Sequence, residues 1–260
     1  MTILDEIAAY TKERIAAEKE QISLTDMKKR AYDLPKCDFP FDRALKKDGL
    51  SFICECKKAS PSKGIIADDF PYMKIAREYE EAGADALSVL TEPKWFLGKN
   101  AYLKEIAGKI TVPVLRKDFT VDEYMIYEAK CLGASAVLLI CSILSPDQIQ
   151  TYLGICRELG LSALVETHSE EEVTTALSCG AGIIGVNNRN LKDFSVDTDM
   201  SIRLRSLIPA GVLFVSESGV RDAEDVRRIR EAGADAVLIG ETLMRAENKK
   251  EKLRELKRLL

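Results

Sequence analysis

The chain has 260 residues, 46% of them hydrophobic and 31% charged, and its formal net charge is −4. These values are typical of a globular protein that is long enough to bury a sizeable core. Because acidic and basic residues are mixed along the whole chain, no basic stripe indicates a nucleic-acid partner.

No segment of the sequence predicts a membrane span or an export signal. The longest apolar run, ASAVLLICSIL, is too short to cross a bilayer as a helix. The start, MTILDEIAAYTKER, is charged from Asp5 onward and lacks the apolar stretch of a signal peptide. We therefore expect a cytoplasmic protein without a membrane partner, and we expect a monomer.

The cysteines and the single histidine do not form a metal or redox motif. The cysteines are spaced neither like a zinc site nor like a CxxC pair, and His168 alone offers little as a further ligand. The sequence thus predicts no metal site. We expect free, buried thiols at positions 37, 54, 56, 131, 141, 156 and 179.

Residues 1–49 predict a helical extension rather than a separate domain. ILDEIAAYTKERIAAEKE has helical periodicity, and YDLPKCDFPFDRAL is an irregular stretch that ends in a short helix. The segment is too small for a core of its own. We expect one domain over 1–260, in which the extension packs over one end of residues 50–260.

One phrase recurs along residues 50–260 and predicts a repeating strand–helix unit. In every copy a helical pattern ends at a glycine, which accepts the left-handed cap conformation, and an apolar run follows. The runs lack polar alternation, which is typical of parallel strands covered on both faces. The copies are EAGADALSVL (81–90), CLGASAVLLI (131–140), SCGAGIIGV (178–186) and EAGADAVLIG (231–240).

Eight strand candidates in about 210 residues favour an α/β fold, a (βα)₈ TIM barrel with an N-terminal helical extension. A doubly wound open sheet is the alternative, but it would usually have fewer strands and a Gly-rich dinucleotide turn, and the sequence contains no GxGxxG. In chain order the expected strands are 50–57, 85–90, 112–117, 134–140, 161–166, 182–187, 211–217 and 235–239.

Charged side chains gather at the predicted carboxyl ends of the strands, where barrels of this class place their active sites. In the first strand Ile53, Glu55 and Lys57 share one face, which we expect to point into the barrel, while Cys54 and Cys56 pack outward. Taken singly, each polar residue could be a turn former or a helix cap. Together they indicate an acid–base site: Glu55, Lys57, Lys117, Asp118, Glu166, Asn187, Asn188, Arg189, Glu217 and Ser218.

The last two strands indicate a phosphate site. SESGVRDAEDV and IGETLMRAE each place a glycine between a strand and a helix start. Such a glycine lets backbone N–H groups approach an anion, and the helix N-terminus adds a favourable dipole. Alternatively, Gly219 and Gly240 only shape turns.

At these residues the sequence resembles the indole-3-glycerol phosphate synthase family over nearly its whole length. The motifs that carry the resemblance are KKASPSKG, PVLRKDF, LVETH, IGVNNRNL, ESG and LIGETLM, in the order and spacing of the family. The resemblance implies closure of an indole ring on 1-(2-carboxyphenylamino)-1-deoxyribulose 5-phosphate, with loss of carbon dioxide and water, in tryptophan biosynthesis. It also implies that neither a cofactor nor a metal takes part.

The same resemblance assigns roles to the catalytic residues. Lys117 matches the general acid that protonates the substrate's keto oxygen, and Glu166 matches its partner for water loss. Lys57 matches the lysine that contacts the anionic substrate and donates a proton in the dehydration. Glu55, Asn187 and Glu217 match residues that orient the substrate and these lysines.

The resemblance implies that the remaining matched positions bind the phosphorylated substrate. The aromatic ring needs an apolar slot, for which Pro61, Trp95, Phe96, Phe119 and Leu138 are candidates, although they could equally be ordinary loop packing. Glu241 stands where some members of the family carry serine, and we expect its carboxylate to turn away from the phosphate. The expected substrate-binding residues are Ser60, Arg189, Ser218, Phe119 and Leu138, and the expected phosphate-binding residues are Lys57, Gly219, Gly240 and Glu241.

Two other functions are possible for such a barrel. A phosphosugar isomerase, such as phosphoribosylanthranilate isomerase, would need a cysteine/aspartate acid–base pair at the strand ends, where this chain has lysines and glutamates. A non-catalytic phosphosugar-binding barrel should have lost part of the charged set. This chain retains the whole set.

Overall fold

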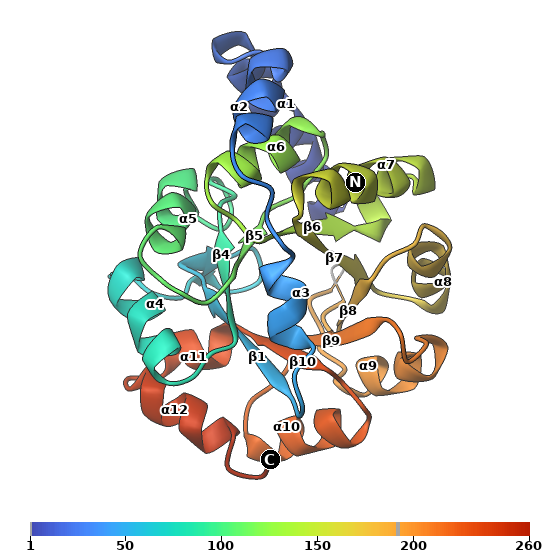
Figure 1. The fold of residues 1–260 in the computed structure, drawn as a ribbon. Helices are drawn as coiled ribbons and strands as arrows, with labels where there is room; N and C mark the ends of the chain where they lie inside the picture. Colours follow the sequence, from blue (N-terminus) through green and yellow to red (C-terminus); the bar gives the residue numbers. More distant parts are fainter. Residues whose placement is uncertain (1, 191–192) are drawn as a thin grey trace.

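Eight parallel strands close into a ring in the computed structural model, which describes residues 2–190 and 193–260. Leu191, the last residue of IGVNNRNL, lies outside the described residues. Every barrel strand pairs with its neighbours in the chain, and the first also pairs with the last, so the (βα)₈ barrel is confirmed (Figure 1). The strands are β1 (Ser51–Cys56), β4 (Ala86–Leu90), β5 (Val114–Lys117), β6 (Ala136–Ile140), β7 (Ser162–Thr167), β8 (Ile183–Asn187), β9 (Leu213–Glu217) and β10 (Ala236–Ile239).

The two faces of each strand belong to two different cores. In β1, Ile53 lies in the inner core of the barrel, whereas Cys54 and Cys56 pack in the outer core between strands and helices. The same alternation holds in β6, where Leu138 faces inward and Leu139 outward. Because both faces are covered, a strand needs no polar alternation, which explains the continuous apolar runs of the sequence.

The helices surround the ring, and glycine ends several of them as expected (Figure 1). Gly83, Gly133, Gly180 and Gly233, the glycines of the recurring phrase, adopt φ values of 84–86°. This left-handed conformation turns the chain from a helix into the next strand. The helices of the barrel are α4 (Tyr72–Glu81), α5 (Asn100–Ala107), α6 (Tyr124–Cys131), η1 (Cys141–Ile143), α7 (Pro146–Leu159), α8 (Glu170–Ser178), α9 (Asp199–Leu204), η2 (Arg205–Leu207), α10 (Ala223–Glu231), α11 (Glu241–Arg245) and α12 (Lys249–Leu256).

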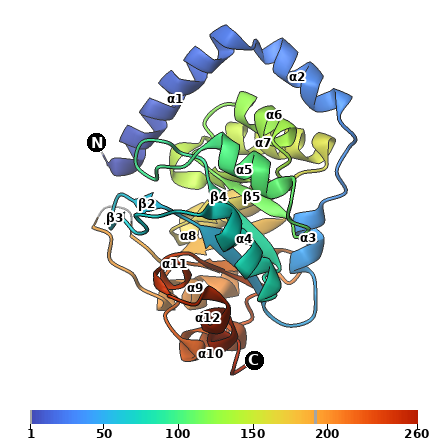
Figure 2. The same cartoon turned by 90° about the vertical axis from the view of Figure 1, so that its left-hand side faces the viewer.

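The extension contacts both ends of the barrel. It forms α1 (Ile3–Gln21), α2 (Leu24–Asp33) and α3 (Pro40–Leu45). Phe41 and Leu45 of α3 are buried in the inner core, and the backbone N–H of Asp42 donates to the hydroxyl of Ser162 at the start of β7. The helix α3 therefore plugs the amino-terminal end of the strands, while α1 begins at the opposite end (Figure 2).

A buried ion pair ties α1 to the barrel. Arg14 Nη2 lies 3.0 Å from both carboxylate oxygens of Asp118, whose side chain is fully buried. Asp118 also accepts a hydrogen bond of 2.7 Å from the hydroxyl of Thr91, and Arg116 lies 3.6 Å away. Because Asp118 directly follows β5, this network connects the extension to the end of that strand. Asp118, which the sequence places with the charged strand ends, thus has structural partners.

A small hairpin follows β1 at the end where α1 begins. Its strands are β2 (Ala59–Ser60) and β3 (Gly64–Ile65), paired antiparallel, with Pro61, Ser62 and Lys63 in the turn (Figure 2). The Ser-Pro-Ser-Lys-Gly stretch predicted a break in the strand but not this hairpin. Gly64 has a φ of 62°, which glycine adopts without strain.

Across residues 2–190 and 193–260, none of the helices combines the length and the apolar character that spanning a bilayer requires.

We predict that replacing Arg14 with methionine destabilises the protein. The change leaves the Asp118 carboxylate buried beside only one remaining cation, Arg116, and should lower the free energy of unfolding by about 3 kcal/mol. Urea denaturation measures this loss. As a control, Lys29→Met removes the exposed ion pair with Asp33 on α2. The urea concentration at which half of this variant is unfolded should stay close to that of the wild type. An unchanged midpoint for Arg14→Met would show that this ion pair does not hold α1.

Candidate active site

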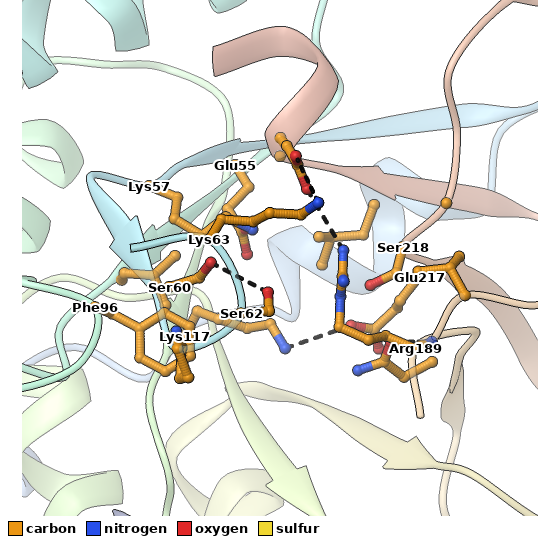
Figure 3. Close-up of a pocket in the computed structure, with 18 of the residues that line it drawn as sticks. Glu55, Lys57, Ser60, Ser62, Lys63, Phe96, Lys117, Arg189, Glu217 and Ser218 are labelled. Carbon is orange, nitrogen blue, oxygen red and sulfur yellow. Dashed lines mark hydrogen bonds and ion pairs between the residues drawn. The ribbon is translucent and has the colours of Figure 1, made fainter. Parts of the chain in front are cut away.

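A cavity of about 500 Å³ lies at the carboxyl ends of the strands (Figure 3). The residues expected to be catalytic, substrate-binding or phosphate-binding all line it, together with residues of the β2–β3 hairpin and of α1, whereas Asn188 does not. The expected residues in its wall are Glu55, Lys57, Ser60, Lys117, Phe119, Leu138, Glu166, Asn187, Arg189, Glu217, Ser218, Gly219, Gly240 and Glu241. The structure therefore brings together side chains from seven different strands or the loops that follow them.

Lys117 lies between two carboxylates that face it across the barrel. Its Nζ is 2.8 Å from Glu166 Oε2 and 3.4 Å from Glu217 Oε2. Burial alone would lower the pKa of Lys117, but the charges of Glu166, Glu217 and Glu55 raise it well above its ordinary value. The lysine is consequently a fully protonated donor that points into the cavity.

Glu166 and Glu217 have the same side chain but different protonation. Burial would raise the pKa of Glu166, yet Lys117 and His168 hold it well below its usual range. Asn187 Nδ2 also donates to Glu166 Oε1 at 3.1 Å. Burial raises the pKa of Glu217 to about 7, and the nearby carboxylates add to the rise despite Lys117. Glu166 is thus ionised at neutral pH, whereas Glu217 can hold a proton there.

Glu55 and Lys57, at the end of β1, form a second acid–base pair in the cavity wall. Lys57 Nζ lies 2.5 Å from Glu55 Oε1, and the hydroxyl of Ser88 donates to Glu55 Oε2 at 3.3 Å. A Cβ atom added at Gly240 would collide with Glu55 Oε1 and come within 2.9 Å of Lys57 Nζ. Gly240 therefore leaves room for this pair, in addition to shaping the turn after β10.

The turn after β9 forms part of the cavity wall and carries Gly219, one of the expected phosphate-binding residues. Ser218 and Gly219 have φ values of 67° and 92°, and a Cβ at Gly219 would lie 2.6 Å from a methyl group of Thr198. Ser218 adopts the left-handed region without being glycine, and Asn188 Nδ2 donates to its carbonyl oxygen at 3.1 Å. Such strain is typical of a functional turn.

Glu241 does not turn away from the cavity, so the expectation for its carboxylate is wrong. The carboxylate lies 3.7 Å from Lys63 Nζ, 3.5 Å from Arg189 Nη2 and 3.1 Å from Arg245 Nε. Three cations are close enough to attract a carboxylate in the absence of another anion. Arg189 also donates to the carbonyl oxygen of Phe194 at 3.2 Å.

An apolar slot forms part of the wall, although not with every aromatic residue that we expected. Pro61, Phe96, Phe119 and Leu138 line the cavity, and the rings of Phe96 and Phe119 have centroids 6.1 Å apart. Trp95 is not part of the lining. Its ring packs edge-on against Tyr10 of α1, with centroids 5.5 Å apart, because the extension covers this loop.

Sequence reasoning missed several residues in and around this site, among them one face of α1 and the single histidine. Ile3, Leu4 and Ile7 of α1 line the cavity, and their spacing on one helix face was the only available signal. His168, two residues after Glu166, lies with Nε2 3.3 Å from Glu166 Oε1. Its place at a strand end was a signal that the search for metal ligands overlooked.

The thiols are free, as expected. All seven cysteines lack a disulfide partner. Four of them are buried, but Cys37, Cys131 and Cys141 are partly exposed, so the expectation of burial is wrong for these three. Burial raises the pKa of Cys54 and Cys56 well above the ordinary value, so both thiols on the outer face of β1 stay neutral. Within residues 2–190 and 193–260, no three His, Cys, Asp or Glu side chains form a group that could hold a metal ion.

We predict a pH-dependent stability that originates at Glu217. Burial raises its pKa from the ordinary 4.5 to about 7, so the folded protein holds a proton that the unfolded chain releases, and stability is lost as the pH rises through this range. Glu217→Gln removes the ionisation. The free energy of unfolding of the variant, relative to wild type, should therefore increase between about pH 4.5 and 7. Urea denaturation at several pH values tests this, with the exposed Glu247→Gln as control; a constant difference for Glu217→Gln would contradict it.

The barrel itself is shared with proteins of unrelated sequence. 3-Hexulose-6-phosphate synthase from Salmonella typhimurium superposes with a TM-score of 0.66 at 16% identity, covering 81% of this chain and 98% of that chain. Thiamine phosphate pyrophosphorylase from Pyrococcus furiosus gives 0.61 at 16% identity, covering 84% and 96%. At this identity the likeness concerns the fold alone.

Sequence comparison is far more specific. The family model of indole-3-glycerol phosphate synthase matches residues 4–256. The protein of that name from Ruminiclostridium cellulolyticum is 55% identical over 245 residues, which cover 94% of each chain. The one from Lachnoclostridium phytofermentans is 51% identical over 270 aligned positions, covering 99% of this chain and 100% of the relative. The chain belongs to the indole-3-glycerol phosphate synthase family.

Proposed function

We propose that the cavity of this carboxy-lyase closes the indole ring of tryptophan biosynthesis with Lys117 as its general acid. The substrate is 1-(2-carboxyphenylamino)-1-deoxyribulose 5-phosphate, and carbon dioxide and water are lost. The observation that carries the assignment is the position of Lys117, whose ammonium lies between Glu166 and Glu217 and points into the cavity. The family of the chain supports the reaction, and the geometry supports the roles.

Lys117 acts in the first step, ring closure. The aniline ring of the substrate is itself the nucleophile, so the protein mainly has to polarise the ketone that it attacks. The carboxylates around Lys117 keep the ammonium charged before the substrate arrives, because they raise its pKa. A protonated lysine can then stabilise the negative charge that develops on the keto oxygen and transfer its proton there.

The second pair of residues acts in water loss. Lys57, held 2.5 Å from Glu55, donates a proton to the leaving hydroxyl and contacts the anionic substrate. Glu166, which Lys117 and His168 keep ionised, accepts the proton that the ring must release. Asn187, Glu55 and Glu217 orient these groups through their hydrogen bonds and charges.

The turns after β9 and β10 and the apolar slot bind the two ends of the substrate. Ser218, Gly219 and Gly240 offer backbone N–H groups to the phosphate, and Arg189 offers a charge. Glu241, whose carboxylate now lies near Arg189, must release this cation to the phosphate. At the other end Phe119, Leu138 and Phe96 pack against the aromatic ring, and Ser60 on the hairpin closes over the substrate.

The isomerase alternative has less support in this cavity. It would need a cysteine and an aspartate as acid and base. Cys54 and Cys56 face the outer core, and Asp118 is paired with Arg14. The lysines and glutamates instead point inward, as the ring-closure mechanism requires.

We also propose a monomer of one domain over residues 1–260 that works in the cytoplasm without a nucleic-acid partner. Seven free thiols are suited to a reducing compartment. The mixed surface charge, with a net value of −4, gives no basic face for nucleic acid. The contacts of α1 and α3 with the barrel support counting the extension as part of the same domain.

Replacing Lys117 or Lys57 with methionine, which retains bulk but removes charge, should affect different kinetic constants. Lys117→Met should lower kcat on the order of 10²–10⁴-fold with little change in KM, because its help is needed mainly in the transition state. Lys57→Met should raise KM as well, because ground-state binding is also lost. Steady-state kinetics, followed by indole fluorescence, measures both. A near-normal kcat in Lys117→Met, together with a large loss in Lys57→Met, would transfer the acid role to Lys57.

Gly240→Ala should damage catalysis more than folding. The new methyl group must displace the Glu55–Lys57 pair, since no other atom stands in its way at close range. We expect kcat to fall about tenfold or more, in the way that misplaced catalytic groups lower rates, with the folded structure retained. The matched control is Gly211→Ala, where nothing lies within 4 Å of the added atom. If both variants turn over alike, the close approach at Gly240 has no catalytic role.

A further inference from the structure

The single histidine of the chain lies between a carboxylate of the site and one outside it. His168 Nε2 is 3.3 Å from Glu166 Oε1, and Nδ1 is 3.4 Å from Glu172 Oε2 in the first turn of α8. The backbone N–H of His168 donates to the same Glu172 oxygen at 2.8 Å. The imidazole is only 16% exposed and does not line the cavity, so it does not touch the substrate. It is thus held directly behind Glu166.

The two flanking carboxylates determine the charge of the ring. A neutral imidazole has one N–H group, so its other nitrogen would direct a lone pair at a carboxylate. Both nitrogens are buried, and in the described part of the chain neither makes a well-aligned hydrogen bond, so charge attraction holds the ring. Burial would lower the pKa of His168, but Glu166 and Glu172 raise it to about 10. The ring is therefore an imidazolium at neutral pH.

Glu166 has three partners, and only one of them takes part in the proposed proton transfer. Lys117 holds Oε2 at 2.8 Å, while Asn187 and His168 both approach Oε1, at 3.1 Å and 3.3 Å. Once Lys117 has given its proton to the substrate, Oε2 no longer faces a cation. Asn187 is neutral, and Glu217, whose pKa burial raises to about 7, supplies no positive charge. His168 is then the remaining cation in contact with Glu166.

We propose that His168 is a positioning residue whose permanent positive charge holds Glu166 in place and ionised while Lys117 gives up its proton. The proposal rests on the proposed function, since it needs Glu166 as the proton acceptor. It assigns to the histidine a role through Glu166 alone, without contact with the reacting atoms. Besides Lys117 and Glu217 on the cavity side of Glu166, Cys141 of η1 is a titratable group near both glutamates, and its thiol stays neutral because burial raises its pKa to about 12.

The test compares two substitutions of His168. His168→Leu removes the charge and both donors, and His168→Gln retains bulk and a donor but no charge. We expect kcat to fall on the order of tenfold in both, with KM within about twofold of wild type, as for a group that acts after binding. The loss should grow towards acid pH, because an opposite charge at this distance lowers a carboxyl pKa by about 1–3 units and its removal raises it again. A wild-type kcat in His168→Gln would overturn the proposal, because the charge would then be unnecessary.

A double-mutant cycle separates this inference from the proposed function. Glu166→Gln alone should abolish most turnover, and His168→Leu added to it should cause no further loss, because the histidine acts only through Glu166. If Glu166→Gln turns over normally, the proposed function is wrong. If Glu166→Gln is impaired and His168→Leu lowers kcat by the same factor in both backgrounds, only the inference is wrong.

Matched measurements exclude a purely structural role. Thermal unfolding of each variant reports whether the change disturbs packing, and Lys109→Gln, which removes an exposed cation paired with Glu105 on α5, should leave kcat unchanged. A fall in unfolding temperature without the fall in kcat would overturn the positioning role. A fall in kcat that does not depend on pH would overturn the charge argument.

Discussion

The charge balance inside the mouth of the barrel is the constraint on which the site depends. Glu55, Glu166 and Glu217 are buried at the mouth of the barrel, where an unpaired carboxylate is costly. Lys117 lies between two of them and Lys57 pairs with the third. No single strand could supply this set, so the ring of strands has to close before the charges can compensate one another.

The two ends of the barrel have different roles: one stabilises the fold, and the other carries the candidate active site. At the amino-terminal end α3 inserts Phe41 and Leu45 into the inner core, and the packing is apolar. At the carboxyl end the inward residues are charged, and the loops leave a cavity. The extension belongs to both ends, because α3 closes one and α1 adds apolar residues to the wall of the other. The Arg14–Asp118 pair joins α1 to the residue that follows Lys117.

The sequence pattern predicted the features that depend on residues close together in the chain. The recurring glycine placed helix ends correctly, and the period of two placed Ile53 and Glu55 on the inner face and Cys54 on the outer. Contacts between distant segments could not be predicted in this way. Arg14 and Asp118 are 104 positions apart, and the packing of Trp95 on Tyr10 depends on how the extension lies.

The side chains around Glu241 show a further limit. From the sequence its negative charge predicted repulsion from a phosphate site and therefore an outward orientation. In the fold, Lys63, Arg189 and Arg245 come from three different segments and surround it, so attraction decides its position. His168 was overlooked for a similar reason, since its importance depends on Glu172 across a turn as well as on its neighbour Glu166.

The pairing of the first barrel strand with the last has a consequence for synthesis on the ribosome. Ser51 of β1 pairs with Ala236 of β10, so the edge of β1 stays open until nearly the whole chain has been translated. An unpaired strand edge is a template for pairing with another chain. Translation that stalls before β10 emerges would release a protein that has most of its helices but two open edges. Such nascent chains are the form of this protein that most needs a chaperone.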